Sequence, residues 1–272
     1  MGDAEGKLAR LKTLLMGLES AVVAFSGGVD STFLLRTAVE VLGERVLAVT
    51  AVSETYLPGE LEEARAMAVL LGVPHRVIHT AELENPAFVA NPPDRCYHCK
   101  KELFSHLWHL ARREGYRWVL DGSNCDDLQD YRPGRRAGQE LGVRSPLCEA
   151  GLGKEDIRLL SRRMGLPTWD KPALACLSSR IPYGQPLTRE RLSQVAEAER
   201  YLLAAGFRQV RVRHHGDIAR VEVNEDHFDR AVALRREIVA RLRDLGFTYV
   251  TLDLQGYRPG SLNESLKETQ KV

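Results

Sequence analysis

A short polar segment near the N-terminus carries the residue types that bind a phosphate group. Within six positions it places two serines, two glycines and an aspartate, namely Ser26, Gly27, Gly28, Asp30 and Ser31. The segment follows the apolar run 21–24 and precedes the helix-like stretch 32–38. Glycines permit positive φ and a close backbone approach, and a following helix adds its unpaired N-terminal donors and its dipole. We therefore predict a phosphate-binding turn, although glycine and serine are also common in ordinary turns.

Asp30 narrows what this turn can bind, because a carboxylate alone would repel a phosphate. A divalent cation between Asp30 and the phosphates removes the conflict, so Mg²⁺ with a nucleoside triphosphate is the natural ligand. The turn has neither the lysine nor the spacing of a GxxxxGK[ST] loop. The string SGGVDS instead resembles the signature of the PP-loop ATP pyrophosphatases. That resemblance implies cleavage of ATP between the α and β phosphates and adenylation of an acceptor.

Cysteines form a second candidate site. Cys96 and Cys99 make a Cys-x-x-Cys motif at the predicted start of a helix, where thiolates are favoured and reachable. Such a pair serves as a redox couple, as half of a zinc site or as two ligands of an iron–sulfur cluster. A distant thiol, Cys176, lies among small residues, and three thiolates would leave one iron of a [4Fe–4S] cluster open to an exogenous sulfide. A single free cysteine is more often a small buried hydrophobe, and we assign Cys125 and Cys148 to that class.

Charged residues in the second half of the chain suggest a site for a polyanion. Arg211 and Arg213 alternate with valines, so both side chains leave the same face of a strand. Two neighbouring guanidinium groups repel each other unless an anion or a carboxylate lies between them. An exposed position on a solvated sheet face is enough to explain each arginine by itself. The arginines taken together favour a site for a bound phosphate. Further candidates are the loop cation Arg258 and the carboxylates Glu199, Glu222 and Asp229.

The composition is typical of a soluble globular protein. The chain has 272 residues, of which 44% are hydrophobic and 28% are charged, and its formal net charge is +1. No global field attracts nucleic acid, which disfavours a tRNA substrate. No apolar run approaches the roughly 20 residues of a membrane span, and residues 8–18 predict an amphipathic helix rather than a signal peptide. Five cysteines without an export signal argue against a disulfide framework and favour a reducing cytoplasm.

Alternating strand and helix patterns predict a parallel sheet in the first part of the chain. Strands are expected over 21–24, 45–52, 75–80 and 118–121, and helices over 59–71 and 100–115. This alternation is typical of an α/β fold with helices on both faces and ligands at the carboxyl ends of the strands. The glycine-rich turn and the pair Asp121 and Gly122 both follow predicted strands, so we expect both at such ends.

Prolines at 172, 182 and 186 mark a change of pattern and suggest a boundary. We predict a PP-loop domain over 1–170, an active-site crossing or linker over 171–187, a smaller α+β domain over 188–260 and a polar tail over 261–272. The elements expected in the smaller domain are helices 188–205 and 228–245 and strands 210–213, 218–223 and 249–254, in an antiparallel or mixed sheet.

Six strings extend the resemblance over nearly the whole chain. They are AVVAFSGGVDSTFLL, NPPDRCYHCKKELF, VLDGSNCDDLQDYRPG, CLSSRIPYG, QVRVRHHGDIARVEV and YVTLDLQGYRPG. In this order they resemble the LarE family of ATP-dependent sulfur transferases, which implies the PP-loop, or adenine nucleotide alpha hydrolase-like, fold. The resemblance also implies that ATP adenylates the carboxylates of pyridinium-3,5-biscarboxylic acid mononucleotide and that sulfur replaces AMP. Two rounds would give the bis-thiocarboxylate precursor of the nickel-pincer cofactor of lactate racemase.

The resemblance assigns roles by position. It implies that ATP and Mg²⁺ are bound by Ser26, Gly27, Gly28, Asp30 and Ser31. We add Asp121 and Gly122 as further cofactor-binding residues, because they follow a predicted strand. The resemblance also implies that the phosphates of the nucleotide substrate are bound by Ser179, Arg180, Arg211, Arg213 and Arg258. Glu199 and Glu222 match acidic positions of the sulfur-transfer site.

The sulfur source divides the family. One branch sacrifices the sulfur of a single cysteine, which aligns with Ala175, and the other carries three cysteines and a cluster that turns over repeatedly. The Cys-x-x-Cys motif favours a [4Fe–4S] cluster on Cys96, Cys99 and Cys176, with sacrifice of Cys176 as the alternative. Cys125, which adjoins the Asp121 loop, is an alternative ligand. We also expect a sulfide donor, a homo-oligomer and hand-over to a nickel-inserting partner.

The nearest rival functions keep the ATP chemistry and change the acceptor. A tRNA-thiolating PP-loop enzyme is disfavoured by the neutral charge. A synthetase of the kind that makes NAD or GMP is disfavoured by the cysteine set, since amidation needs no thiol. A nucleotide-sensing or zinc-binding module without turnover is the remaining alternative, and release of pyrophosphate would exclude it.

Overall fold

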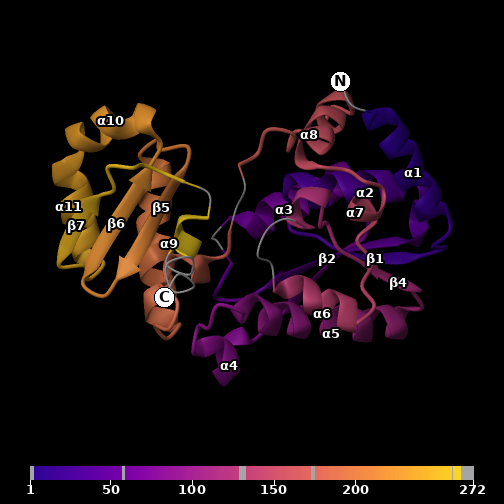
Figure 1. Ribbon diagram of the computed structural model, residues 1–272, viewed down its shortest axis with the longest axis horizontal. Coiled ribbons are helices and arrows are strands. Elements are labelled where there is room, and N and C mark those ends of the chain that lie inside the picture. The colour runs from indigo at the N-terminus through magenta and orange to yellow at the C-terminus, as the bar shows by residue number, and fades with distance from the viewer. Residues whose placement is uncertain (1–2, 57–58, 129–132, 173–174, 259, 265–272) are drawn as a thin grey trace. The chain divides into compact units, whose positions relative to one another are not determined.

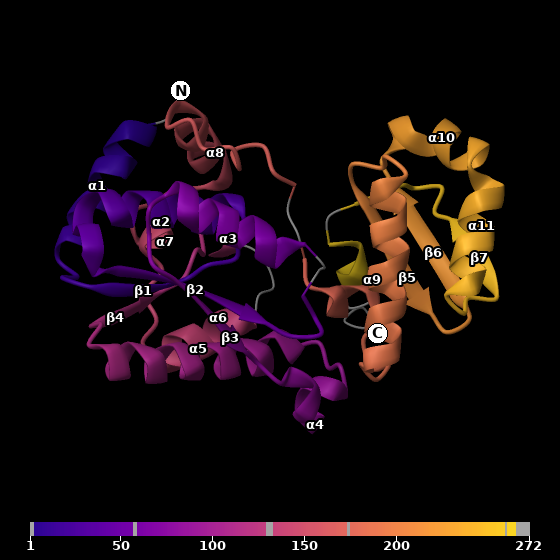
Figure 2. The same ribbon diagram turned by 180° about the vertical axis from the view of Figure 1, so that it is seen from behind.

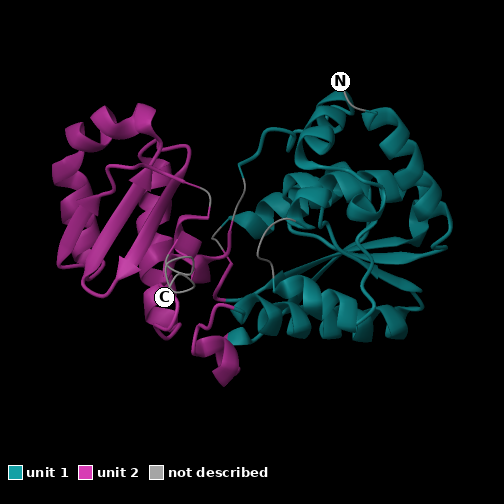
Figure 3. Ribbon diagram, in the orientation of Figure 1, with its two compact units in different colours: residues 1–53, 59–82, 94–174 teal, residues 54–58, 83–93, 175–272 magenta. Residues whose placement is uncertain are grey.

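The computed structural model of the chain describes residues 3–56, 59–128, 133–172, 175–258 and 260–264. It divides into two compact units (Figure 3). Unit 1 comprises residues 1–53, 59–82 and 94–174, and unit 2 comprises residues 54–58, 83–93 and 175–272. The expected crossing 171–187 is thus shared between the units, and its residues 173–174 lie outside the described residues. The same holds for 265–272 of the expected tail.

Unit 1 is built on a parallel four-stranded sheet. Its strands are β1 (Ala21–Ala24), β2 (Val46–Val52), β3 (His75–His79) and β4 (Trp118–Leu120), in the order β3-β2-β1-β4. β1 is central and pairs in parallel with β2 and β4. Its first three residues are buried without alternation, as expected for a strand covered on both faces. The predicted α/β fold is confirmed.

Helices cover both faces of this sheet (Figures 1 and 2). One face carries α1 (Ala4–Met16), α2 (Val29–Leu42), α3 (Glu60–Leu70), α7 (Pro146–Glu149) and α8 (Lys154–Arg163), and the other carries α5 (Arg95–Glu114) and α6 (Gly134–Glu140). Val23 of β1 belongs to the first core with Phe33, whereas Val22 belongs to the second with Phe104. Neighbouring residues of one strand therefore anchor opposite layers and hold the end of β1 in place.

Unit 2 contains a mixed three-stranded sheet. Its strands are β5 (Val210–His215), β6 (Ile218–Val223) and β7 (Tyr249–Leu252), and its helices are α4 (Pro86–Val89), α9 (Arg189–Ala204), α10 (Phe228–Ala233) and α11 (Arg235–Asp244). β5 and β6 form an antiparallel hairpin, and β7 pairs with β6 in parallel. α9 packs on β5, and α11 packs on β7 and against α9. This is the α+β arrangement that the sequence predicts.

Two helices differ from the sequence prediction. α5 begins at Arg95 instead of Lys100, so its first turns include Cys96 and Cys99. A single helix over 228–245 is wrong, because Leu234 has ψ 12° where a helix needs about −42° and the chain turns there between α10 and α11. None of the helices formed by the described residues is both long and apolar enough to cross a membrane.

Candidate active site

The glycine-rich turn joins the end of β1 to the start of α2 (Figure 1). Gly27 has a left-handed φ of 67°, and a Cβ at this position would lie 3.1 Å from the Cα of Ala64 in α3. Both the conformation and the close packing require glycine. Gly28 has an ordinary φ of −80°, so the positive φ considered for both glycines occurs at Gly27 alone.

The N-terminus of α2 presents donors to an anion. Gly28 is the N-cap residue and supplies no side-chain cap, and Thr32 donates the first helical backbone bond, to the carbonyl of Gly28 at 3.0 Å. The amides before Thr32 are the N-terminal donors that a phosphate can use. The hydroxyls of Ser26 and Ser31 lie 3.1 Å apart beside them. Local sequence is sufficient to build this part of the site.

Two lysines that the sequence analysis missed also reach the turn. Lys154 Nζ lies 2.6 Å from Asp30 Oδ2, and Lys171 Nζ lies 3.2 Å from the carbonyl oxygen of Gly27. Asp30 Oδ1 is buried and has no hydrogen-bond partner among the described residues. These lysines lie 124 and 144 positions from their partners in the sequence. No local signal marks such residues, because the fold alone brings them to the turn.

The loop after β4 touches the glycine-rich turn. A Cβ on Gly122 would lie 3.1 Å from the backbone nitrogen of Ser31, so the two segments are in direct contact. Asp121 Oδ1 accepts a hydrogen bond of 2.6 Å from the Ser145 hydroxyl. A cavity of about 200 Å³ opens beside it, with Asp121, Ser145 and Cys148 in its lining. The two strand-end segments singled out in the sequence thus meet at one edge of the sheet.

The cysteines of the proposed cluster are divided between the units. Cys96 is exposed and Cys99 half-buried in the first turns of α5, where their spacing places them on one face of the helix. Cys99 Sγ donates to Glu82 Oε1 at 3.6 Å. Cys176 is exposed and belongs to unit 2, directly before the 3₁₀ helix Leu177–Arg180. Across the described ranges, no three or more His, Cys, Asp or Glu side chains form a group that could hold a metal ion.

The other two cysteines contact each other. Cys125 Sγ donates to the backbone carbonyl of Cys148 at 3.4 Å. Burial, together with the Cys125 thiol, raises the pKa of Cys148. Both residues are half-buried, so they do not reach the full burial expected of a small hydrophobe.

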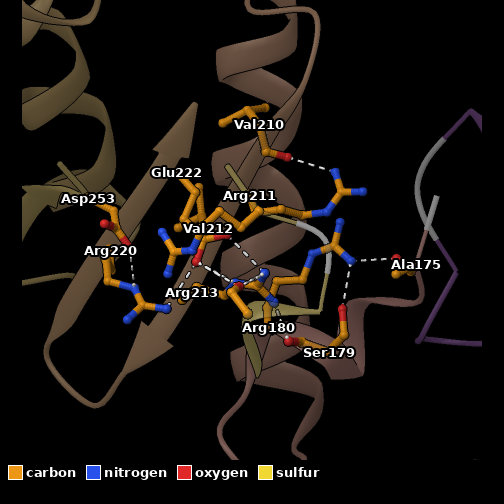
Figure 4. A network of polar contacts seen from close by, with 12 residues as sticks. Ala175, Ser179, Arg180, Val210, Arg211, Val212, Arg213, Arg220, Glu222 and Asp253 are labelled. Carbon is orange, nitrogen blue, oxygen red and sulfur yellow. Dashed lines mark hydrogen bonds and ion pairs between the residues drawn. The ribbon is translucent and has the colours of Figure 1, made fainter. Parts of the chain in front are cut away.

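Most of the charged residues singled out in the second half of the chain lie in a buried ion-pair network (Figure 4). Arg180 donates to Glu199 through two bonds of 2.8 and 2.6 Å, and Arg213 donates to Glu222 through two bonds of 3.0 and 2.9 Å. None of the four residues is more than 6% exposed. A solvated sheet face is therefore the wrong explanation for Arg213. Paired, two-bond geometry offsets part of the cost of burying these charges.

Several elements of unit 2 build this network. Glu199 comes from α9 and also accepts a hydrogen bond of 2.9 Å from the backbone amide of Val212 in β5. Arg213 donates to the carbonyl of Ser179 at 2.7 Å and to the hydroxyl of Ser261 at 2.9 Å. Arg220 of β6 donates to Glu222 at 3.0 Å. The carboxylates are thus held by both charged and neutral donors from separate parts of the chain.

Arg211 differs from Arg213 although both leave the same face of β5. Its guanidinium lies 5.3 Å from the ring of Tyr257 and donates to the carbonyl of Val210 at 2.8 Å, and the residue is 6% exposed. Burial, followed by the charge of Arg180, lowers the pKa of Arg211. A nearby anion would offset this cost of burying its charge.

Two further charged residues lie on other elements. Arg258 pairs with Glu264 at 3.2 Å, and this hydrogen bond, with the charges of Asp253 and Glu222, raises the pKa of Arg258. Asp229 lies in the first turn of α10.

The chain is similar over nearly its whole length to other proteins. It is 47% identical over 264 residues to an uncharacterised protein of Synechocystis sp., with 96% of this chain and 98% of the relative covered. It is 42% identical over 271 residues to the pyridinium-3,5-bisthiocarboxylic acid mononucleotide synthase of Lactiplantibacillus plantarum, with 99% of this chain and 98% of the relative covered. The chain belongs to the LarE family.

More distant similarity supports the fold of this LarE-family chain. An NH(3)-dependent NAD(+) synthetase of Methanosarcina acetivorans is 31% identical over 168 residues, which are 58% of this chain and 64% of the relative. This similarity agrees with the PP-loop fold of the parallel sheet and its glycine-rich turn. No protein-family model matches the chain.

Proposed function

We propose that this LarE-family protein is an ATP-dependent sulfur transferase acting on pyridinium-3,5-biscarboxylic acid mononucleotide. A substrate carboxylate oxygen attacks the α-phosphorus of ATP, and pyrophosphate leaves. A sulfur nucleophile then attacks the acyl carbon, and AMP leaves. Two rounds give the bis-thiocarboxylate precursor of the nickel-pincer cofactor of lactate racemase. The observation that carries the proposal is the 42% identity to the Lactiplantibacillus synthase across 99% of the chain.

Unit 1 supplies the residues for ATP. We infer that the backbone amides of Gly27 and Gly28 and the hydroxyls of Ser26 and Ser31 hold the β and γ phosphates. Asp30 suits a Mg²⁺ ligand, because its Oδ1 is buried without a hydrogen-bond partner among the described residues. Asp30 Oδ2 accepts a hydrogen bond from Lys154 Nζ. When the cation binds Asp30, we expect the Lys154 ammonium to pair with a phosphate instead. Asp121 and Gly122 complete this side of the site.

Unit 2 supplies the residues for the mononucleotide. Arg211 and Arg258, together with the Ser179 hydroxyl, are the proposed phosphate contacts. Arg180 and Arg213 already hold carboxylates, so a phosphate reaching them must compete with Glu199 and Glu222. We infer that these two arginines chiefly position Glu199 and Glu222 for sulfur transfer.

We propose a [4Fe–4S] cluster on Cys96, Cys99 and Cys176 as the route for sulfur. Thiolates are the ligands that such clusters use, and none of these three cysteines is fully buried. When bound, the cluster supplies an iron that holds an exogenous sulfide. We further propose that the protein works in the cytoplasm as a homo-oligomer, receives sulfide from a donor and passes its product to a nickel-inserting partner.

Pyrophosphate release tests the function directly. Protein with ATP, Mg²⁺, sulfide and the pyridinium biscarboxylate nucleotide is expected to release pyrophosphate and AMP and to form a thiocarboxylate, detected by mass spectrometry. The matched reactions replace the nucleotide by tRNA or by an ammonia acceptor. Release with tRNA, and none with the pyridinium nucleotide, would replace the proposal by tRNA thiolation. ATP binding without release in any reaction would favour a sensing module.

Iron and sulfide analysis after anaerobic purification tests the sulfur source. About four irons per chain are expected from a full cluster, and Cys96→Ser should lose them. Cys148→Ser is the matched control and should keep the wild-type iron content. Iron-free protein in which Cys176 becomes dehydroalanine during turnover would establish the sacrificial route instead.

A further inference from the structure

Lys171 makes a contact that the proposed reaction does not use. Its ammonium nitrogen donates to the carbonyl of Gly27 at 3.2 Å and to Glu63 Oε2 of α3 at 2.6 Å. The lysine side chain is 18% exposed, whereas that of Glu63 is 62% exposed. The ammonium is therefore directed at the glycine-rich turn, and the carboxylate approaches it from the solvent side.

The backbone of Lys171 is itself held in place. Arg158 of α8 donates to the carbonyl of Lys171 at 3.0 Å and to that of Trp169 at 2.9 Å. The amide of Lys171 donates to the carbonyl of Thr168 at 3.0 Å. The side chain thus extends from a fixed backbone, and its position is not set by the turn that it contacts.

Peptide geometry determines what this contact does. The Gly27 carbonyl and the Gly28 amide belong to one planar peptide unit, and no described peptide bond is cis. In a trans unit the C=O and the N–H point in opposite directions, so a contact that fixes the oxygen also fixes the amide hydrogen. Gly27 has φ 67° and lacks a Cβ, so this peptide has more freedom to rotate than most. A hydrogen bond to the oxygen removes that freedom.

We propose that Lys171 is a positioning residue of the glycine-rich turn. It sets the Gly27–Gly28 peptide so that the Gly28 amide, which here makes a long 3.4 Å hydrogen bond to Ser26 Oγ, donates to a bound phosphate. Lys171 acts through the backbone and does not touch the nucleotide. The proposal rests on the proposed function, because it needs the turn to bind the phosphates of ATP. It adds a residue 144 positions away to the phosphate site.

Calorimetric binding of ATP, pyrophosphate and adenosine to the full chain tests this role. Lys171→Met is expected to weaken the binding of ATP and pyrophosphate by about tenfold or more. Adenosine binding and Tm should stay unchanged. Lys171→Arg keeps a charged donor and should restore most of the affinity. Lys12→Met is the matched control, since Lys12 forms a similar 2.5 Å pair with Glu40 on α2, and it should bind all three molecules like the wild type.

The outcomes separate this inference from the proposed function. Wild-type protein that binds neither ATP nor pyrophosphate would overturn the proposed function and this inference with it. Wild-type binding that Lys171→Met retains in full would overturn the role of Lys171 alone. An equal loss of affinity for ATP and adenosine, or a lower Tm in both Lys171→Met and Lys171→Arg, would show a merely structural role for Lys171. Either result would also overturn the inference.

Discussion

The glycine-rich turn of unit 1 and the arginine–glutamate network of unit 2 differ in their hydrogen-bond donors and in the exposure of their ion pairs. The turn uses backbone amides, and its Lys154–Asp30 pair remains 31% and 23% exposed in its side chains. The network uses guanidinium groups, and the side chains of Arg180 and Glu199 are 0% and 2% exposed. The first arrangement leaves donors for a ligand, whereas the second uses its donors within the protein.

This difference decides what a phosphate must displace. At the turn it meets helix N-terminal amides without a side-chain cap and one accessible ion pair, whose net value is small. At Arg213 it would have to replace Glu222, which accepts two bonds from that arginine and another from Arg220. Buried pairs of this kind are costly to break. Nearby arginines therefore do not by themselves make a phosphate site.

The largest effect is expected for stability when the network is broken. Glu222→Gln leaves the buried Arg213 without its carboxylate and Arg220 paired with Asp253 alone, and it should lower the free energy of unfolding by about 3–5 kcal/mol. Urea unfolding measures this change. Glu197→Gln breaks the exposed pair with Arg200 and should cost about 1 kcal/mol or less. Similar losses for the two variants would contradict the expected difference between buried and exposed ion pairs.

The next effect concerns activity at the turn. Asp30→Asn removes the proposed Mg²⁺ ligand and should lower the rate of pyrophosphate release by about 10²–10³-fold. Its Tm should change little, because the ion pair with Lys154 is partly exposed. Glu40→Gln, on the same helix, serves as the control and should keep full activity. Wild-type release by Asp30→Asn would remove Asp30 from the site.

Arg211 and Arg213 leave one face of β5 but differ in their partners, so their substitutions should have different effects. Arg211→Met should raise KM for the pyridinium nucleotide by about tenfold while changing the free energy of unfolding by about 1 kcal/mol or less. Its lowered pKa means that burial opposes its charge, so methionine relieves a cost. Arg213→Met should instead cost about 3 kcal/mol, because the buried Glu222 loses the two hydrogen bonds that it accepts from Arg213. The reverse pattern would assign the phosphate to Arg213.

A smaller effect follows from pH. Burial, and then the charge of Arg191, lowers the pKa of His214 below its ordinary value, with His215 adding to this and Asp217 opposing it. The unfolded chain therefore binds a proton more readily, and stability should fall as the pH drops from about 6.5 through the folded pKa. His214→Gln should flatten this part of a urea-unfolding profile. An unchanged profile would exclude His214 as a source of acid sensitivity.

The sequence predicts most of the fold because its signals are local. Apolar runs and turn residues give β1, the glycine-rich turn and the start of α2 nearly as the structure has them. The break between α10 and α11 at Leu234 could not be predicted in this way, because no proline or glycine marks it. The cysteine motif is equally visible, but whether Cys176 joins it depends on how the two units meet, which no spacing in the sequence encodes.

The strand, the glycine turn and the helix can be predicted from consecutive residues, because the left-handed φ of Gly27 and the hydroxyls around it are local features. The contacts of Lys154 and Lys171 with that turn, and the pairing of Arg180 and Arg213 with Glu199 and Glu222, became visible only in the folded chain. The two kinds of feature differ in how far apart in the sequence their determinants lie. Backbone donors are arranged by a few consecutive dihedral angles, whereas a charged side chain takes its role from the partners that folding places beside it.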